Sequence, residues 1–378
     1  MATPGFFDYL IVGGGIAGVT AAETIRSRDR SGNILIVSKE REPLYSRVLL
    51  PNYVRGKIAR EKVYLRTFDD YTKHGIDLAL GQEVVGVNFD TRQVVTSEEK
   101  KISFGKILIS AGGEVMPWDI AGVASDRVLR LQTIADADRC RARMSGASSE
   151  AIVVGGGFIG LEFIESAVAY GYQAHLFLQE AHYFGDIYDL RGSEIIESNF
   201  ARNGVAVYPE TSLSKIEEDA AGLIARGGRD IMVKGAWVGV DIGVKRNLAV
   251  FAGSGLQIGK GIRTDSFLQT GVPGVWAAGD IAEYFDPIFG QYRMLGNWTN
   301  AFMQGRIAGV NMSAEDSSGS MEFRTVSGYS ITHLGLQITH IGKTEGGSAG
   351  RDLQTVHLGQ RRNQILGEAI AEIIVLRV

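Results

Sequence analysis

The sequence predicts an α/β protein in which one strand–turn–helix unit occurs twice. The turn Gly13-Gly14-Gly15-Ile16-Ala17-Gly18 follows the apolar run 9–12, and the turn Gly155-Gly156-Gly157-Phe158-Ile159-Gly160 follows the apolar run 151–154. Such runs are typical of buried parallel strands, and apolar residues at helical spacing follow both turns. The repeated pattern predicts two Rossmann-like dinucleotide-binding domains.

Each turn supplies small residues where a dinucleotide needs a tight bend, close approach of the backbone to the pyrophosphate, and close packing of helix on strand. The helix that follows offers its first amides to a phosphate. Glycines also serve any sharp strand-to-helix turn, so one such turn alone is weak evidence, and the repetition carries the inference. We expect the cofactor-binding residues to be Gly13, Gly14, Gly15, Ile16, Ala17 and Gly18 in the first turn, and Gly155, Gly157, Phe158, Ile159 and Gly160 in the second.

Length and composition are those of an ordinary globular protein. The 378 residues suffice for two or three domains, and 45% of them are hydrophobic and 22% charged. A formal net charge of −4 gives no support for a nucleic-acid partner, which would need a basic surface. The sequence contains no evident export signal and no apolar stretch long enough to cross a bilayer, so we expect a soluble cytoplasmic protein without a membrane span.

Cys140 is the single cysteine, which excludes an internal disulfide or a paired-cysteine redox centre. It lies in the charged, helix-like stretch 136–141 and is interpreted as a packing residue. The six histidines have no metal-ligand spacing, and no cysteine cluster exists for an iron–sulfur centre. We therefore predict no metal site.

Polar and small residues follow two further strands of the first unit. The strand 34–37 ends at Ser38-Lys39-Glu40, where an acid such as Glu40 accepts hydrogen bonds from an adenosine ribose, or is simply a solvated charge at a strand end. Arg47 either donates hydrogen bonds from its guanidinium group to a pyrophosphate or is a surface charge. After the strand 106–109, Ala111 and Gly112 are small enough for close approach of a ligand.

The second unit carries a signal for the choice of nucleotide. Its strand 174–178 ends in Gln179 and Glu180, and no arginine or lysine follows before Arg191. The 2′-phosphate of NADPH needs cations, whereas an acidic or neutral acceptor suits the free 2′-hydroxyl of NADH. The sequence favours NADH over NADPH.

Three later segments resemble those of a known family. Thr270-Gly271-Val272-Pro273-Gly274-Val275-Trp276-Ala277-Ala278-Gly279-Asp280 resembles the second flavin motif of the pyridine nucleotide-disulfide oxidoreductase family, whose matching aspartate binds the ribityl chain of FAD. The stretch 240–247, which includes Gly243, is similar to the family's return crossing from the NAD domain to the FAD domain. The stretch 298–306 is similar to the helix whose first amides face the flavin pyrimidine.

The resemblance implies a glutathione-reductase-like fold with two dinucleotide-binding domains. It places FAD-binding segments at 1–112 and 244–312, an NAD(P)-binding domain at 113–243, and a short C-terminal α+β domain at 321–378. It assigns Gly279 and Asp280 to FAD. A helix that begins near Trp298 would stabilise negative charge on a reduced flavin, and Trp298 itself either shields a flavin face or packs in the core. The short C-terminal domain leaves the oligomeric state open.

Within the family the chain resembles the branch without a redox disulfide, which includes rubredoxin and ferredoxin reductases and the flavoprotein part of NADH-dependent nitrite reductase. Glu162 matches a family glutamate that lies near the flavin and nicotinamide and is the one catalytic candidate. Its alternative role is that of an acid stabilised by the helix dipole. Asn52 stands where relatives often place a lysine paired with this glutamate, and Lys39 falls where some relatives have the ribose acid.

The resemblance implies an FAD-dependent oxidoreductase that takes a hydride from NADH and passes electrons to an acceptor. A one-electron carrier protein of the rubredoxin or ferredoxin type is the favoured acceptor, because flavins can split a two-electron donation into single steps. Two alternatives remain: a flavin-bearing assembly or electron-transfer subunit of a larger complex, and an FAD-dependent dehydrogenase of an organic substrate. The complete second glycine turn disfavours the last of these.

Overall fold

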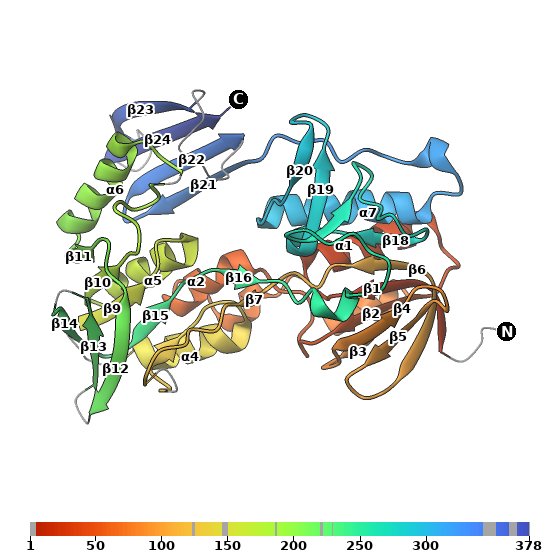
Figure 1. The fold of residues 1–378 in the computed structure, drawn as a ribbon, viewed down its shortest axis with the longest axis horizontal. Coiled ribbons are helices and arrows are strands. Elements are labelled where there is room, and N and C mark those ends of the chain that lie inside the picture. The colour runs from red at the N-terminus through yellow and green to blue at the C-terminus, as the bar shows by residue number, and fades with distance from the viewer. Residues whose placement is uncertain are drawn as a thin grey trace. The chain divides into compact units, whose positions relative to one another are not determined.

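The computed structural model describes residues 5–122, 125–145, 150–185, 187–219, 222–228, 230–342, 353–362 and 369–377 (Figure 1). The chain divides into two compact units. Unit 1 comprises Met1–Val48, Arg60–Glu114 and Lys245–Thr325, and unit 2 comprises Leu49–Ala59, Val115–Val244 and Val326–Val378. Within the described ranges, no helix has the length and apolar character needed to cross a membrane.

Unit 1 is built on a largely parallel sheet of order β3-β2-β1-β6-β5-β4, with β18 also paired to β6. The central strand β1 runs parallel to both β2 and β6, which confirms the strands predicted at 9–12, 34–37 and 106–109. The strands are β1 (Phe6–Val12), β2 (Ile34–Ser38), β3 (Ile76–Leu80), β4 (Val84–Asn88), β5 (Gln93–Thr96), β6 (Lys101–Ile109) and β18 (Val275–Ala277).

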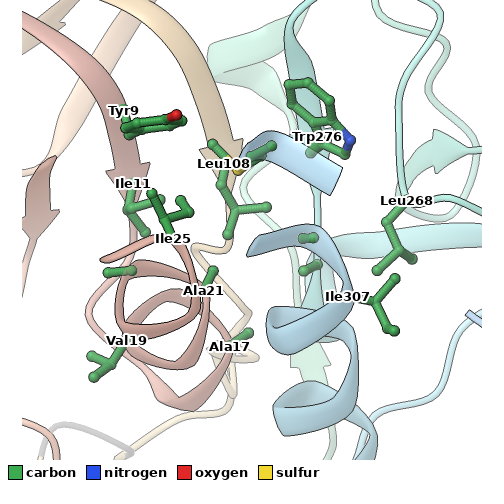
Figure 2. Packing of buried hydrophobic residues seen from close by; sticks show 14 of the residues in the cluster. Tyr9, Ile11, Ala17, Val19, Ala21, Ile25, Leu108, Leu268, Trp276 and Ile307 are labelled. Atoms are coloured by element: carbon green, nitrogen blue, oxygen red, sulfur yellow. The ribbon is translucent and has the colours of Figure 1, made fainter. Parts of the chain in front are cut away.

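Helices α1 (Ile16–Arg28) and α7 (Trp298–Ser313) lie side by side against this sheet (Figure 2). They approach closely because glycines of α7 face α1: a Cβ atom built on Gly305 would lie 2.2 Å from the carbonyl oxygen of Ala17. Successive β1 residues enter opposite cores, with Ile11 facing the two helices and Leu10 facing the other side. This alternation buries both faces of the strand, as parallel sheets require.

Smaller elements complete unit 1. They are η2 (Arg60–Val63), α3 (Phe68–Lys73), η3 (Ala249–Phe251), η4 (Gly279–Ile281) and η5 (Ser317–Gly319), with a second sheet of β17 (Ile262–Thr264), β19 (Ala282–Asp286) and β20 (Gln291–Arg293). The chain crosses between the units within η1 (Arg47–Leu49), β7 (Glu114–Val115) and β16 (Val244–Lys245), and also between Ala59 and Arg60 and between Thr325 and Val326.

Unit 2 repeats the plan with a parallel sheet of order β11-β10-β9-β15-β8. Strand β9 runs parallel to β10, which confirms the strands predicted at 151–154 and 174–178. The strands are β8 (Val128–Leu129), β9 (Glu150–Val154), β10 (Gln173–Phe177), β11 (Val205–Tyr208) and β15 (Val238–Val240), and an antiparallel sheet holds β12 (Leu213–Asp219), β13 (Gly222–Gly227) and β14 (Met232–Gly235). The helices are α2 (Leu50–Val54), α4 (Ile134–Met144), α5 (Phe158–Ala169) and α6 (Leu190–Arg202).

Cys140 lies on α4 and is fully buried. Burial raises the pKa of its thiol to about 12, and its sulfur contacts the carbonyl oxygen of Arg130 at 3.4 Å. Such a thiol stays protonated and is a poor nucleophile, as expected for a packing residue.

A separate sheet lies at the end of the chain, where the resemblance implies a short α+β domain. Its described residues after Thr325 form four strands and no helix, in the order β21-β22-β24-β23. The strands are β21 (Gly328–His333), β22 (Leu336–Gly342), β23 (Leu353–Arg362) and β24 (Ala369–Arg377). Strands β21 and β22 are joined through Leu334 and Gly335, whose φ angles of 46° and 76° are those of a two-residue hairpin turn.

Candidate functional site

The first glycine turn is shaped by backbone atoms that leave no room for side chains. Gly13 has a φ of 113°, and a Cβ atom there would lie 2.3 Å from the carbonyl oxygen of Ser110. At Gly18 a Cβ atom would lie 2.0 Å from the carbonyl oxygen of Gly13. Gly15 differs, because nothing lies within 4 Å of a Cβ atom built there, and as the N-cap of α1 it has no side chain to cap the helix. The turn is therefore tight on the inside and open at the helix start, which suits a phosphate.

Glu40 and Arg47 come together at the end of β2. One carboxylate oxygen of Glu40 accepts a hydrogen bond from Arg47 Nη2 at 2.8 Å, and the other accepts one from the hydroxyl of Tyr45. Lys39 contacts different acids, with its Nζ 2.6 Å from Glu114. Of the two residues considered for the ribose position, Glu40 is the one that faces Arg47. The sequence analysis missed Tyr45, although it lies two positions before Arg47 in the same loop.

The segment Gly279-Asp280 lies against the helix that follows the first turn. A Cβ atom built on Gly279, whose φ is 77°, would lie 3.3 Å from the Cβ atom of Ala17. Burial raises the pKa of Asp280, while the positive charges of Arg47 and Arg246 act in the opposite direction. Arg246 also donates a hydrogen bond from Nε to the carbonyl oxygen of Asp280 at 2.9 Å. The aspartate is thus held partly out of water in the same unit as the first turn, where it can accept hydrogen bonds from ligand hydroxyls.

Two other predicted contacts lie in unit 1. The backbone of Ala111 flanks the first turn, and Gly112 has a φ of 67° with open space around its Cα atom. Helix α7 begins at Trp298, and Asn297 caps it by accepting a hydrogen bond from the amide of Asn300 at 2.9 Å. Trp298 is half-buried and packs against the core of unit 1. The core-packing alternative therefore describes its contacts in this structure.

The second glycine turn has the same backbone shape as the first. Gly155 has a φ of 100°, and a Cβ atom there would lie 1.7 Å from the carbonyl oxygen of Asp241. At Gly160 a Cβ atom would lie 2.4 Å from the carbonyl oxygen of Gly155. The start of the helix differs, because a Cβ atom on Gly157 would lie 2.3 Å from a carboxylate oxygen of Asp241. Phe158, the first residue of α5, packs against the ring of Phe184 with centroids 5.0 Å apart.

The predicted nucleotide-selecting residues follow β10. Gln179 and Glu180 are both exposed, and the carbonyl oxygen of Glu180 accepts a hydrogen bond from the amide of Glu210 at 3.1 Å. Gly243 is exposed as well, and its carbonyl oxygen accepts a hydrogen bond from the amide of Met116 at 3.0 Å. All three lie in unit 2 with the second turn, and exposed side chains at 179 and 180 are accessible to a ligand.

Glu162 has an arginine partner. Arg55 Nη1 lies 2.6 Å from a carboxylate oxygen of Glu162, and Arg55 Nη2 donates to Asn52 Oδ1 at 3.0 Å. Because Asn52 stands where relatives often have a lysine, the resemblance gave Glu162 no cationic partner. Arg55, three positions later, supplies the positive charge. Helix α5 begins at Phe158, so Glu162 lies beyond the first turn and the helix dipole does not account for its position.

A second acid shares the same arginine. Glu165 Oε2 lies 3.5 Å from Arg55 Nη1 and 3.4 Å from His333 Nδ1, and Lys57 Nζ lies 3.5 Å from Glu165 Oε1. Burial raises the pKa of Glu165, but His333, Arg55 and Lys57 together outweigh burial and hold that pKa below its usual range. All these residues belong to unit 2. We call Arg55, Glu162, Glu165, Lys57 and His333 the Arg55 cluster.

The sequence matches the family model described as pyridine nucleotide-disulphide oxidoreductase over residues 7–305. Its relatives include the ferredoxin–NAD(+) reductase component of the p-cumate 2,3-dioxygenase system of Pseudomonas putida, which is 30% identical over 77% of this chain and 71% of the relative. The assimilatory nitrate reductase electron transfer subunit of Bacillus subtilis is 25% identical over 86% of this chain. This chain covers only 42% of that subunit's length.

Solved structures share the fold. The putidaredoxin reductase chain in a covalent complex with putidaredoxin superposes with a TM-score of 0.81 at 24% identity, over 87% of this chain and 79% of that one. An NAD-dependent persulfide reductase from A. fulgidus superposes with a TM-score of 0.85 at 22% identity, over 96% of this chain and 69% of that one. The family match spans most of the sequence and includes both glycine turns and Gly279-Asp280. This chain belongs to the pyridine nucleotide-disulphide oxidoreductase family.

Proposed function

We propose that this chain is an FAD-dependent oxidoreductase that takes a hydride from NADH and delivers electrons to an iron–sulfur carrier protein. The observation that carries the proposal is the pair of glycine turns, one in each compact unit, of which the first shares its unit with the Glu40–Arg47 pair and Asp280. The names of the relatives, a ferredoxin–NAD(+) reductase component and putidaredoxin reductase among them, support both the donor and the acceptor class.

FAD fits the residues of unit 1. The open helix start at Gly15 leaves room for a pyrophosphate, and Glu40 and Arg47 offer an acceptor for ribose hydroxyls beside a cation for phosphate. Asp280 would accept hydrogen bonds from the ribityl hydroxyls. When bound, FAD accepts a hydride and can return the electrons one at a time. The protein's own contribution is to bind and orient, since no side chain in the proposal donates or removes a proton.

NADH would bind to the turn of unit 2, with its adenosine ribose at Gln179 and Glu180. Glu162 would then position groups for hydride transfer, with its carboxylate held by Arg55. The domain ranges predicted from the resemblance and the cytoplasmic location stay predictions.

Glu180 should discriminate against NADPH. An exposed carboxylate at the ribose position accepts a hydrogen bond from a 2′-hydroxyl and repels a 2′-phosphate. We therefore expect kcat/KM for NADPH to be lower than for NADH by about tenfold or more. Glu180→Ala should narrow this ratio, and Glu194→Ala, which removes an exposed acid of α6 in the same unit, should leave it unchanged. Steady-state kinetics with both nucleotides checks this. An unchanged ratio in Glu180→Ala would remove Glu180 from the nucleotide site.

The acceptor is tested separately. Catalytic amounts of the FAD-loaded protein, mixed anaerobically with NADH and a [2Fe–2S] ferredoxin, should reduce the ferredoxin, as followed by loss of its visible absorbance. Reduction of artificial acceptors such as ferricyanide, with no transfer to several iron–sulfur carriers, would contradict that acceptor class.

A second candidate is an electron-transfer subunit of a larger enzyme. It is favoured by the Bacillus subtilis subunit and by subunit epsilon of an NADH-dependent phenylglyoxylate dehydrogenase from Aromatoleum evansii, which is 26% identical over 84% of this chain. Copurification of the tagged chain with a specific partner subunit, combined with activity found only in the complex, would support this candidate.

A further inference from the structure

Asp241 places a carboxylate on the first amides of α5. It follows the buried strand β15 directly, and its Oδ2 atom accepts a hydrogen bond from the amide of Gly160 at 2.8 Å. The N-cap residue Gly157 has no side chain, so Asp241 caps the helix from a different part of the chain.

Among the described residues, no side chain covers the start of α1 as Asp241 covers the start of α5. Gly15 is the N-cap of α1 and occupies the same place in its turn as Gly157, yet nothing lies within 4 Å of a Cβ atom built on it. On Gly157 a Cβ atom would lie 2.3 Å from Asp241 Oδ2. The two turns, which have the same backbone shape, thus differ at the helix start, which is open in unit 1 and covered by a carboxylate in unit 2.

A carboxylate and a pyrophosphate compete for the same helix start. A dinucleotide bound to such a turn places its pyrophosphate on the first amides of the helix, where backbone donors and the helix dipole favour an anion. Asp241 already uses one of those donors, the amide of Gly160. Two anions at contact distance repel each other, and a half-buried carboxylate that loses its amide donors loses what stabilises its charge.

We propose that Asp241 limits the affinity of unit 2 for dinucleotides: in the free protein its carboxylate occupies the phosphate position of the second glycine turn, and NADH binds only by displacing it. This inference rests on the proposed function, because it assumes that the second turn is the NADH site. Asp241 would then be a residue that limits affinity through its charge and takes no part in the chemistry.

Asp241→Asn tests the proposal. The asparagine side chain has nearly the same shape and can still accept the hydrogen bond from Gly160, but it carries no charge. We expect the Kd of the FAD-loaded protein for NAD⁺, measured by isothermal titration calorimetry, to fall by about fivefold or more. KM for NADH should fall with it, whereas kcat should change much less. Asp241→Ser, which keeps a small acceptor, should shift Kd in the same direction.

Asp189→Asn is the matched control. Asp189 caps α6 in the same unit by accepting a hydrogen bond from the amide of Gly192 at 2.8 Å, but α6 does not follow a glycine turn. Its neutralisation should lower the melting temperature to a similar extent as Asp241→Asn and leave Kd for NAD⁺ unchanged.

The outcomes separate this inference from the proposed function. If wild type and Asp241→Asn bind NAD⁺ and NADH equally well, or the variant binds more weakly while still folded, Asp241 is a helix cap and this inference alone is overturned. If neither protein binds NADH or NADPH, and neither shows flavin reduction by them, the proposed function and this inference fall together. Tighter binding by the variant supports both.

Discussion

Gly15→Ala is expected to leave unit 1 folded and to weaken its binding of FAD by about tenfold or more. A glycine in this turn lets the backbone approach the pyrophosphate, and a loss of about 1.4 kcal/mol in binding free energy is a tenfold loss of affinity. The backbone at Gly15, with a φ of −76°, is accessible to alanine, and a Cβ atom there meets no protein atom within 4 Å. The added methyl group therefore stands where the pyrophosphate must approach the helix start. The flavin-to-protein ratio after purification, and titration of the apoprotein with FAD, measure the effect.

Gly18→Ala in the same turn is the matched comparison and should act differently. Its Cβ atom would lie 2.0 Å from the carbonyl oxygen of Gly13 and 2.8 Å from Ser110 Oγ, so the helix would have to move away from the strand. We expect a loss of about 3 kcal/mol in the free energy of unfolding of unit 1, as for overpacked cores, with FAD lost as a consequence. Wild-type FAD affinity in Gly15→Ala would contradict the placement of FAD on this turn.

Arg55→Met should destabilise unit 2 by about 3 kcal/mol, because removal of one partner of a buried ion pair leaves an uncompensated charge. The Arg55 side chain is only 6% exposed and lies between the carboxylates of Glu162 and Glu165. Without it, two acids one helical turn apart face each other, and the pKa of Glu165 should rise. Urea denaturation gives the free energy, and hydrogen–deuterium exchange reports units 1 and 2 separately.

The pH dependence of the Arg55→Met effect has a definite sign. The pKa of Glu165 lies below its usual value of 4.5 in the folded protein, so the stability that its carboxylate contributes is present above that value and is lost as the pH falls through the lower, folded-state pKa. The Arg55→Met variant lacks much of the stability that the Glu165 carboxylate contributes in the wild type. The stability difference between wild type and variant should therefore be largest near neutral pH and shrink on acidification below 4.5.

Lys57→Met is the control that removes a positive charge near Glu165 without removing a buried side chain. Lys57 contacts the same Glu165 at 3.5 Å, but its side chain is 57% exposed, and exposed ion pairs contribute about 1 kcal/mol or less. Equal destabilisation by Lys57→Met and Arg55→Met, or a difference from wild type that does not depend on pH, would contradict the account of the Arg55 cluster.

The fold was predictable because its signals are local. About twenty consecutive residues encode each glycine turn together with the strand before it and the helix after it. The same requirements for a tight bend and close packing recur in both units. The strand pairings β1–β2 and β9–β10 follow from these units. For the end of the chain the resemblance implied a short α+β domain but not its individual strands, although Leu334 and Gly335, with positive φ angles, form a hairpin turn that is equally local.

The unpredicted contacts of the candidate site depend on residues far apart in sequence. Arg55 and Glu162 are separated by 107 positions in the sequence, and Asp241 and Gly160 by 81. No local sequence pattern therefore predicts either contact. Partial signals exist in both cases. Arg55 lies three positions after Asn52, about one helical turn away, and Asp241 directly follows a parallel strand at the edge where ligands of such sheets bind.

Anaerobic stopped-flow mixing shows whether NADH reduces FAD bound to this chain. The FAD-loaded protein would be mixed with NADH and, separately, with NADPH, while the long-wavelength absorbance of the flavin is followed. We expect rapid bleaching by NADH and much slower bleaching by NADPH. If the protein retains FAD and neither nucleotide bleaches it, the chain is not an NADH-dependent reductase.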